Sequence, residues 1–344
     1  MSTPLAALIR SHIATHGPMP VEEFTGLALY HPQYGYYTNG YNFLPAPIAN
    51  SLTPSALYPH DFTTAPEITP LFGATLANWV ARQWLTLKSP SPFTLMECGP
   101  GRGILMRDML THLQTAHPAC YSAARPLLVE TSPTLTQLQK TTLTAFPQCH
   151  WDTTPTSNLP IILVANELLD AFPHTQLIQH EGRITPRTIA TTNTGTFIFP
   201  QHGPITEHSP GMKTWLQTLP QNLSAALFAD YGAATDGPTG DTLQAVYRHQ
   251  KVDVFHKIGE TDLTHHVNFA HVNAALAESH PHLESQPLEH LTPFLLNHGL
   301  ASLALQIADA DGTHSTHDTA LHRLLHPTQM GTLFKVQCYT CTHP

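Results

Sequence analysis

Residues 93–108 read FTLMECGPGRGILMRD, and this stretch decides the fold. An apolar run ends at Glu97, glycines follow at alternate positions 99, 101 and 103, and an amphipathic pattern begins at Ile104. The order predicts a buried strand, a tight loop and a helix. Glycines at 99, 101 and 103 let the backbone approach a ligand, and the Glu97 carboxylate can accept hydrogen bonds from ligand hydroxyl or ammonium groups. The stretch therefore predicts a nucleotide-type cofactor site.

The features that the glycine loop lacks narrow the class of cofactor. A dinucleotide fingerprint would place glycine at Ile104 and an acid about 20 residues further on, and neither condition is met cleanly. A P-loop would end in Gly-Lys-Ser/Thr, whereas Gly103 is followed by Ile104 and Leu105. The remaining pattern, E-x-G-x-G-x-G, is typical of class I S-adenosylmethionine (SAM) methyltransferases. SAM carries no phosphate, so no lysine is needed. We expect Glu97, Gly99, Gly101, Gly103 and Leu105 to bind this cofactor.

A second acid supports a SAM site. After the helix predicted for residues 104–114, the segment RPLLVET reads as a buried strand that ends at Glu130. A carboxylate at the end of this strand can accept hydrogen bonds from both ribose hydroxyls of the cofactor. Glu130 is therefore predicted to bind the ribose.

Composition limits the other classes of function. The chain has 344 residues, a net charge of -9 and 11% charged residues, which argues against a general nucleic-acid binder because counterion release needs clustered Lys and Arg. No run of 18 apolar residues is present, so a membrane span is not expected. The five cysteines are an odd, scattered set, which favours a reducing compartment. The N-terminus has the pattern of a short amphipathic helix closed by Gly17, not of a signal or transit peptide.

Two groups of residues could suggest a metal site, and we expect none. Cys338 and Cys341 form a lone C-x-x-C that reads as part of a C-terminal strand. His265, His266 and His271 lack a convincing ligand spacing and an accompanying acid motif, so core or solvated histidines are favoured.

The chain is expected to contain three segments. Residues 1–90 form an N-terminal helical segment with a loop rich in Pro, Asn and Ser at 39–60, residues 91–235 form a SAM-binding Rossmann-like core, and residues 236–344 form a helical extension with the closing strands of the sheet. The apolar runs LLVE, IILVANE and AALFADYG predict buried parallel strands. Residues 174–200 alternate like an antiparallel ribbon. The fold class is α/β, a mixed sheet with helices on both faces.

Several motifs, in the same order, resemble those of the NDUFAF7/MidA family of SAM-dependent methyltransferases. They run from about residue 17 to 338 and read GPMPVEEF, HPQYGYY, DFTTAPEI, MECGPGRGILMRDML, LLVETSP, ANELLDAFP, ADYG, GDTLQAVYRH, GETDLTHHVNF and MGTLFKV. The resemblance implies a class I methyltransferase fold, and mitochondrial relatives are regarded as protein arginine methyltransferases acting on a respiratory complex I subunit. With no transit peptide visible, it favours a bacterial cytoplasmic member.

Two departures limit what the resemblance implies about the substrate. The loop before DFTTAPE is longer than usual, and the family's Gly-Asp before Phe is His60-Asp61 here. If residues 39–60 form a lid at the mouth of the active site, the choice of substrate would differ from that of the family.

An arginine acceptor needs carboxylates that orient its guanidinium group and ease proton loss during methylation. Asn166 and Glu167 follow a buried strand, at the edge where α/β sheets bind ligands. Asp170 would share the face of Glu167 if a helix began there, and the alternative is an acid pair at a helix start. We therefore expect Glu167, Asp170 and the earlier Glu67 to be catalytic, and Asn166 to bind the cofactor.

The TAPE segment supplies the other candidates. Pro66 fixes the local backbone, so Thr64 and Pro66 are expected beside the cofactor. Glu67 could face the cofactor ammonium group or the substrate, or serve as an ordinary acid at a helix start. Pocket-lining or packing roles remain open for a further set: Tyr34, Tyr36, Tyr37, Asp230, Tyr231, Asp262 and His265.

These residues favour a SAM-dependent methyltransferase, most simply one that modifies arginine in a protein. Two other functions remain open. A non-catalytic assembly or chaperone factor could retain the fold for protein binding, because fold does not establish function. A small-molecule methyltransferase would have an enclosed apolar pocket in place of an open acidic groove.

Overall fold

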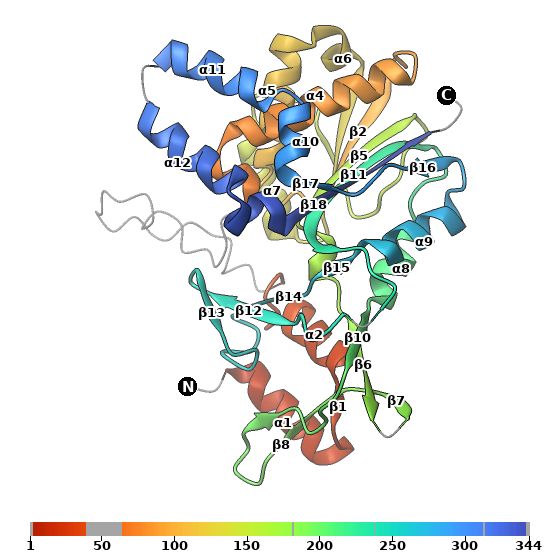
Figure 1. The fold of residues 1–344 in the computed structure, drawn as a ribbon, viewed down its shortest axis with the longest axis vertical. Helices are drawn as coiled ribbons and strands as arrows, with labels where there is room; N and C mark the ends of the chain where they lie inside the picture. The colour runs from red at the N-terminus through yellow and green to blue at the C-terminus, as the bar shows by residue number, and fades with distance from the viewer. Residues whose placement is uncertain (1–2, 39–63, 181, 238, 312–313, 342–344) are drawn as a thin grey trace. The chain divides into compact units, whose positions relative to one another are not determined.

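The structure is a computed structural model that describes residues 3–38, 64–180, 182–237, 239–311 and 314–341 (Figure 1). The predicted loop at 39–60, with His60, lies outside the described residues. The chain forms two compact units that alternate along the sequence. Unit 1 contains Met1–Thr63, Leu169–Trp215 and Ala234–His271, and unit 2 contains Thr64–Leu168, Leu216–Ala233 and Val272–Pro344. The three expected segments follow chain order, whereas these units interleave.

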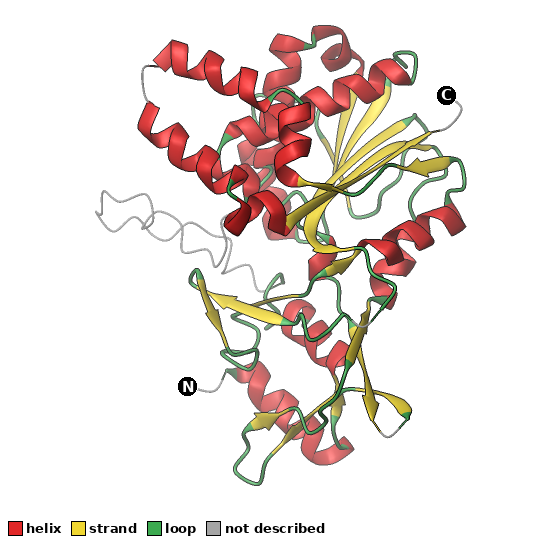
Figure 2. Ribbon diagram, in the orientation of Figure 1, coloured by secondary structure: helices red, strands yellow, loops and turns green. Residues whose placement is uncertain are grey.

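Unit 2 contains a large mixed sheet with helices packed on it, shown in yellow and red in Figure 2. The order of its main strands is β16-β18-β11-β5-β2-β3-β4, and β17 also pairs with β18. The strands are β2 (Phe93–Cys98), β3 (Ala124–Val129), β4 (His150–Asp152), β5 (Ile161–Asn166), β11 (Leu223–Ala233), β16 (Leu283–Ser285), β17 (Glu289–His290) and β18 (Phe334–Cys341). The helices are α3 (Ala65–Ile68), α4 (Pro70–Thr86), α5 (Ile104–Ala116), α6 (Pro118–Ala123), α7 (Pro133–Thr142), α10 (Leu291–Asn297), α11 (Leu300–Asp311), α12 (His314–Leu325) and the short turn η4 (Pro327–Gly331).

The strands from β11 to β4 are parallel, and the central two, β5 and β2, are almost wholly apolar. β11, β5, β2, β3 and β4 pair in parallel, and every residue of β2 is buried. Strands that are covered on both faces need continuous apolar runs, which the sequence supplies at FTLMEC and IILVAN. β18 closes the sheet antiparallel to β11, with Leu227 opposite Cys338. The predicted mixed α/β sheet is confirmed, and Cys338 and Cys341 lie in its last strand.

The starts of three helices follow from one local rule. Thr3, Thr69 and Ser132 each precede a proline, and each accepts a hydrogen bond from a backbone amide in the first turn, which begins α1, α4 and α7. Proline suits this first helical position because its missing N–H would be unpaired there in any case. In Figure 1, α4 and α5 lie side by side against the sheet, and their apolar faces form much of the core.

The described residues of unit 1 form helices α1 and α2 and several small antiparallel sheets. Its core consists mainly of apolar side chains from α1, α2 and the strands that pack on them. The predicted ribbon is confirmed: β6 pairs with β7 and with β10. The elements are α1 (Pro4–His16), β1 (Met19–Pro20), α2 (Val21–Tyr30), η3 (Leu169–Ala171), β6 (Thr175–His180), β7 (Arg183–Pro186), β8 (Thr188–Thr191), β9 (Phe197–Ile198), β10 (Ile205–His208), β12 (Gln244–Tyr247), β13 (Gln250–Val252), β14 (Asp262–Thr264) and β15 (Val267–Asn268).

The chain passes from one unit to the other five times, and two of these passages lie within helices, α8 (Pro210–Gln217) and α9 (Phe269–Ser279). No helix of the described residues is both long and apolar enough to cross a membrane.

Candidate cofactor site

The glycine loop joins β2 to α5 and needs its glycines for two different reasons. Gly99, Gly101 and Gly103 all have positive φ angles, of 65°, 51° and 77°, a region that side chains with a Cβ rarely adopt. A Cβ on Gly99 would lie 2.8 Å from Leu168 Cδ1, and one on Gly103 would lie 3.3 Å from Gln139 Cγ. A Cβ on Gly101 would meet no atom within 4 Å. Gly99 and Gly103 therefore leave room for the side chains of Leu168 and Gln139, whereas Gly101 faces open space.

Glu97 is the penultimate residue of β2, and its buried carboxylate is only partly hydrogen-bonded. Burial raises the pKa of Glu97 well above its usual value, a backbone hydrogen bond from Met106 lowers it, and the nearby Asp108 and Glu130 raise it further. Its Oε2 atom is buried without a hydrogen-bond partner. An unpaired buried oxygen costs free energy that a ligand donor can recover.

Glu130 follows β3, the strand next to β2, and is held at both of its oxygens. Oε1 accepts from the Ser132 amide at 2.8 Å, and Oε2 accepts from Gln139 Nε2 at 3.0 Å. Burial raises the pKa of Glu130, and the hydrogen bonds from Ser132, Gln139 and Thr131 lower it. The carboxylate thus has a fixed orientation beside the glycine loop.

Asn166 and Glu167 lie where β5 ends, on the other side of β2. Glu167 has φ of 50°, a strained conformation for a residue with a side chain, and such strain is common at functional sites. Its Oε1 accepts from Asn166 Nδ2 at 2.9 Å and from the Ala65 amide at 3.2 Å. The Oδ1 atom of Asn166 is buried without a hydrogen-bond partner. β3, β2 and β5 therefore bring Glu130, Glu97 and Asn166 to one edge of the sheet.

The TAPE segment forms α3, a single helical turn. Thr64 precedes it and its carbonyl accepts from the Glu67 amide, while Pro66 is buried in the turn. Glu67 pairs with Arg102 of the glycine loop, with 3.5 Å between Glu67 Oε1 and Arg102 Nη1. Both side chains are less than one fifth exposed. Glu67 therefore contacts the loop that is predicted to bind the cofactor, as well as being an acid in a first helical turn.

Two predicted residues differ in setting from the others. Leu105 is buried in the apolar core of unit 2, so its side chain packs and does not line open space. Asp170 is buried on η3 of unit 1 and follows the left-handed Glu167, so no helix carries the two acids on one face. A shared helical face required a helix to begin at Glu167, and the chain turns there instead. The catalytic roles of Glu67, Glu167 and Asp170 stay predictions.

The other candidates make contacts within their own units, and Tyr34 is exposed. Tyr231 stacks edge-on against Phe334 in unit 2, and Asp230 accepts from the amide that follows it. In unit 1, Tyr37 donates to Asp262 Oδ1 at 3.2 Å. Further ring contacts join Tyr36 to Tyr37 and His31 to Tyr34.

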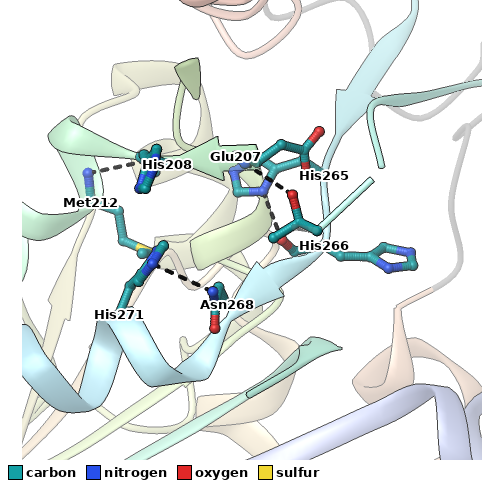
Figure 3. A pocket seen from close by; sticks show the side chains of 9 residues that line it. Glu207, His208, Met212, His265, His266, Asn268 and His271 are labelled. Atoms are coloured by element: carbon teal, nitrogen blue, oxygen red, sulfur yellow. Dashed lines mark hydrogen bonds between the residues drawn. The ribbon is translucent and has the colours of Figure 1, made fainter. Parts of the chain in front are cut away.

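A small pocket in unit 1 is lined by four histidines, and it includes the trio His265, His266 and His271 (Figure 3). His271 stacks on His208 with 5.1 Å between ring centroids. Burial and His174 lower the pKa of His265 to about 3, and its two ring nitrogens lie 3.1 Å from the carbonyl oxygens of His266 and Phe172. Within the described parts of the chain, no group of three or more His, Cys, Asp and Glu residues could hold a metal ion. The described contacts of these histidines are with neighbouring rings and backbone carbonyl groups.

Sequence reasoning missed two residues of the site. Arg102 lies inside the glycine loop, where its pairing with Glu67 depends on a contact between distant segments. Gln139 lies on α7, four residues from both Leu135 and Leu143, all three of which are buried. A glutamine within an apolar helical stripe is a signal of a buried hydrogen-bonding role, and it could have been noticed.

The donor and acceptor groups at this edge of unit 2 fit a SAM-type cofactor. Buried acceptors without partners occur at Glu97 and Asn166, a fixed carboxylate occurs at Glu130, and space remains above Gly101. SAM offers an ammonium group and two ribose hydroxyls as donors and has no phosphate, which agrees with a loop whose arginine is paired with Glu67.

Comparisons with known proteins agree with this chemistry. A family described as "Putative S-adenosyl-L-methionine-dependent methyltransferase" matches residues 75–202 and 188–285. The rat protein named protein arginine methyltransferase NDUFAF7, mitochondrial, is 28% identical, across 96% of this chain and 83% of its own length. The human protein of that name is 26% identical, across 96% and 82%.

Solved structures give the same result for the fold. A COG1565 superfamily member from Burkholderia thailandensis, crystallised with S-adenosyl-homocysteine (SAH), has a TM-score of 0.83 and 26% identity, covering 98% of this chain and 91% of its own. A native structure from the same superfamily and organism has a TM-score of 0.80 and 27% identity, with the same coverage.

Proposed function

We propose that this chain, which belongs to the matched family of S-adenosyl-L-methionine-dependent methyltransferases, transfers the methyl group of SAM to an arginine side chain in a protein. The observation that carries the arginine proposal is similarity over nearly the whole chain to proteins named protein arginine methyltransferases. The candidate protein substrates include a homologue of a respiratory complex I subunit.

The cofactor side of the proposal assigns a role to each group at the edge of the sheet. SAM supplies an electrophilic methyl group on a sulfonium. Glu130 accepts from the ribose hydroxyls, and Glu97 and Asn166 accept from donors of the cofactor at their unpartnered oxygens. The glycine loop, with Thr64 and Pro66 of the adjacent turn, brings backbone close to the cofactor. Alignment and exclusion of water are what methyl transfer needs most from a protein.

The acceptor side rests on carboxylates. A guanidinium group has a pKa above about 12, so its nitrogen becomes nucleophilic only as it loses a proton. Glu167 is a suitable carboxylate because its strained backbone and its contacts with Ala65 and Asn166 hold it at the strand end. Glu67 is the second candidate, and its bond to Arg102 places it against the glycine loop. Asp170, in unit 1, is a third candidate from sequence.

Labelling tests the proposal directly. The purified chain is incubated with methyl-labelled SAM and a cell lysate, and the labelled protein is hydrolysed for amino-acid analysis. We expect methylarginine. Label on lysine or on small molecules would refute the arginine acceptor, and would favour the small-molecule methyltransferase in the latter case.

A variant of Glu167 separates catalysis from assembly. Glu167→Gln keeps an acceptor for Ala65 and Asn166 but removes the negative charge, so we expect SAH binding within about 3-fold of wild type and methylation lower by about 100-fold or more. If this variant restored full function in cells that lack the gene, the chain would act as a non-catalytic assembly factor.

A further inference from the structure

Gln139 makes three hydrogen bonds that converge on the predicted cofactor site. Its side chain is fully buried on α7. Nε2 donates to the Gly101 carbonyl at 2.8 Å and to Glu130 Oε2 at 3.0 Å, and Oε1 accepts from Trp151 Nε1 of β4 at 3.0 Å. One amide thus joins the middle of the glycine loop, the carboxylate after β3 and the indole of β4.

These partners allow only one orientation of the amide. The indole N–H can only donate, and the Gly101 carbonyl can only accept. An amide flipped by half a turn would place two donors against the indole and an oxygen against two acceptors. Gln139 therefore cannot exchange its partners by rotation, and three hydrogen bonds hold its amide in one orientation.

The close approach of α7 to the loop depends on Gly103. A Cβ at Gly103 would lie 3.3 Å from Gln139 Cγ and 3.4 Å from its Cα, which is closer than most such contacts. The third glycine of the loop therefore makes room for Gln139, while the space above Gly101 stays open.

We propose that Gln139 is the positioning residue for the ribose of the cofactor, because its amide fixes the Glu130 carboxylate relative to the Gly101 backbone. The inference rests on the proposed role of Glu130 in ribose binding. Glu130 Oε1 is already held by the Ser132 amide, so the bond from Gln139 to Oε2 removes the remaining freedom of the carboxylate plane. A preorganised carboxylate loses less entropy when the diol binds.

The substitution Gln139→Glu tests this role with little change of shape. An ionised glutamate can still accept from Trp151 Nε1 but donates to neither Gly101 nor Glu130; because two adjacent buried carboxyl groups share a proton, Gln139→Met, which has no donor at any pH, is measured in parallel. The measurement is calorimetric affinity for two ligands, SAH and its 2′,3′-dideoxy analogue. Their affinity ratio is the ribose preference, which reports on the diol contact, whereas the affinity for the analogue reports on everything else.

In the wild type, two hydrogen bonds to a charged acceptor should give a ribose preference of about 100-fold. In Gln139→Glu we expect this preference to fall below about 5-fold, with the affinity for the dideoxy analogue changed by less than about 3-fold. A general structural defect would instead weaken both ligands equally. Far-ultraviolet circular dichroism and the melting temperature establish that the variant is folded.

Three further variants complete the test. Gln137→Glu adds the same charge to an exposed position of α7 and should keep the wild-type preference. Trp151→Phe removes the hydrogen bond to Gln139 Oε1 and leaves both bonds from Nε2, so this variant should also keep the wild-type ribose preference. Glu130→Gln should lose the preference; if it does not, the proposed role of Glu130 is wrong.

If Glu130→Gln loses the ribose preference and Gln139→Glu keeps it, the positioning role of Gln139 is overturned while that of Glu130 stands. Equal weakening of both ligands by Gln139→Glu would overturn it as well. If Gln139→Glu does not fold, Gln139→Met carries the same expectations, since it has similar length and no donor.

Discussion

Two buried glutamates, Glu97 in unit 2 and Glu207 in unit 1, have opposite surroundings. Glu207 accepts from Gln176 Nε2 at 2.7 Å, from the Thr242 amide at 3.0 Å and from the Thr242 hydroxyl, and His174 Nε2 lies 3.6 Å from its Oε1. Glu97 has Met106 as its backbone donor, two carboxylates nearby and an oxygen without a partner. Both side chains are at most 4% exposed, so burial does not distinguish them.

Their pKa values differ in direction for this reason. Burial raises the pKa of both groups, but His174, Thr242 and Gln176 outweigh it at Glu207 and bring its pKa down to about 2. At Glu97 the pKa stays raised. A buried acid with a full set of hydrogen bonds stabilises its own unit, whereas one with incomplete hydrogen bonds lowers stability, as a ligand-binding group would.

The largest expected effect comes from destroying the complete network. Glu207→Ala removes the acceptor of Gln176 and Thr242 and the carboxylate beside the buried His174, so we expect the free energy of unfolding to fall by about 3–5 kcal/mol. Urea denaturation measures this loss. The control Glu260→Ala removes a half-exposed acid that pairs with Lys257 and should cost less than about 1 kcal/mol. A loss below about 1 kcal/mol for Glu207→Ala would remove the contrast with Glu97.

The equivalent change at Glu97 should separate stability from binding. Glu97→Gln removes a carboxylate that is unfavourable when buried, so at pH 7.5 we expect stability to stay equal or to rise. Affinity for SAH should fall by about 10- to 100-fold, because a charged acceptor is lost. Urea denaturation and calorimetry on the same protein measure the two quantities. A large loss of stability with unchanged SAH affinity would make Glu97 a structural residue like Glu207.

Acid should affect the two glutamates in opposite ways. The lowered pKa of Glu207 means that its contribution is present above its unfolded pKa, near 4.5, and is lost as pH falls toward about 2. The raised pKa of Glu97 means that its contribution becomes less favourable as pH rises above about 4.5. Between pH 5 and pH 3, wild type should therefore lose about 2 kcal/mol more than Glu207→Gln, measured by urea denaturation at each pH. Parallel curves for the two proteins would contradict the low pKa of Glu207.

The smallest effect tests the helix that carries Gln139. Ser132 caps α7, with its hydroxyl 3.4 Å from the Leu135 amide, so Ser132→Ala should cost about 1 kcal/mol of stability. SAH affinity should stay within about 3-fold of wild type, because the Ser132 amide that holds Glu130 remains. Thermal denaturation and calorimetry measure both. A loss of affinity above 10-fold would show that α7 is held less firmly by Gln139 than we infer.

The parts of the site that could be predicted from sequence are those encoded locally. The strand that contains Glu97, the glycines at 99, 101 and 103 and the helix from Ile104 follow one another in the chain, so their order predicts their structure. The same holds for Glu130 at the end of an apolar run.

The remaining contacts depend on the tertiary fold. The bond from Gln139 to Gly101 requires α7 to return to the glycine loop, and the pairing of Arg102 with Glu67 requires α3 to reach it. The left-handed turn at Glu167 has no glycine to indicate it, so the sequence could not show that the condition for a shared helical face with Asp170 is not met. The interleaving of the two units also depends on contacts between segments that are distant in the chain, so local sequence patterns do not predict it.

The position of β18 has a consequence for synthesis on the ribosome. This strand comes last in the described chain, yet it lies inside the sheet, between β11 and β16. While the chain emerges, β11 has its parallel neighbour β5 but keeps an open edge with buried-type side chains such as Leu227 until the segment with Cys338 arrives. An open apolar edge invites pairing between nascent chains. We therefore expect the unfinished chain to depend on chaperones, and stop codons before β18 to yield insoluble protein instead of a smaller working enzyme.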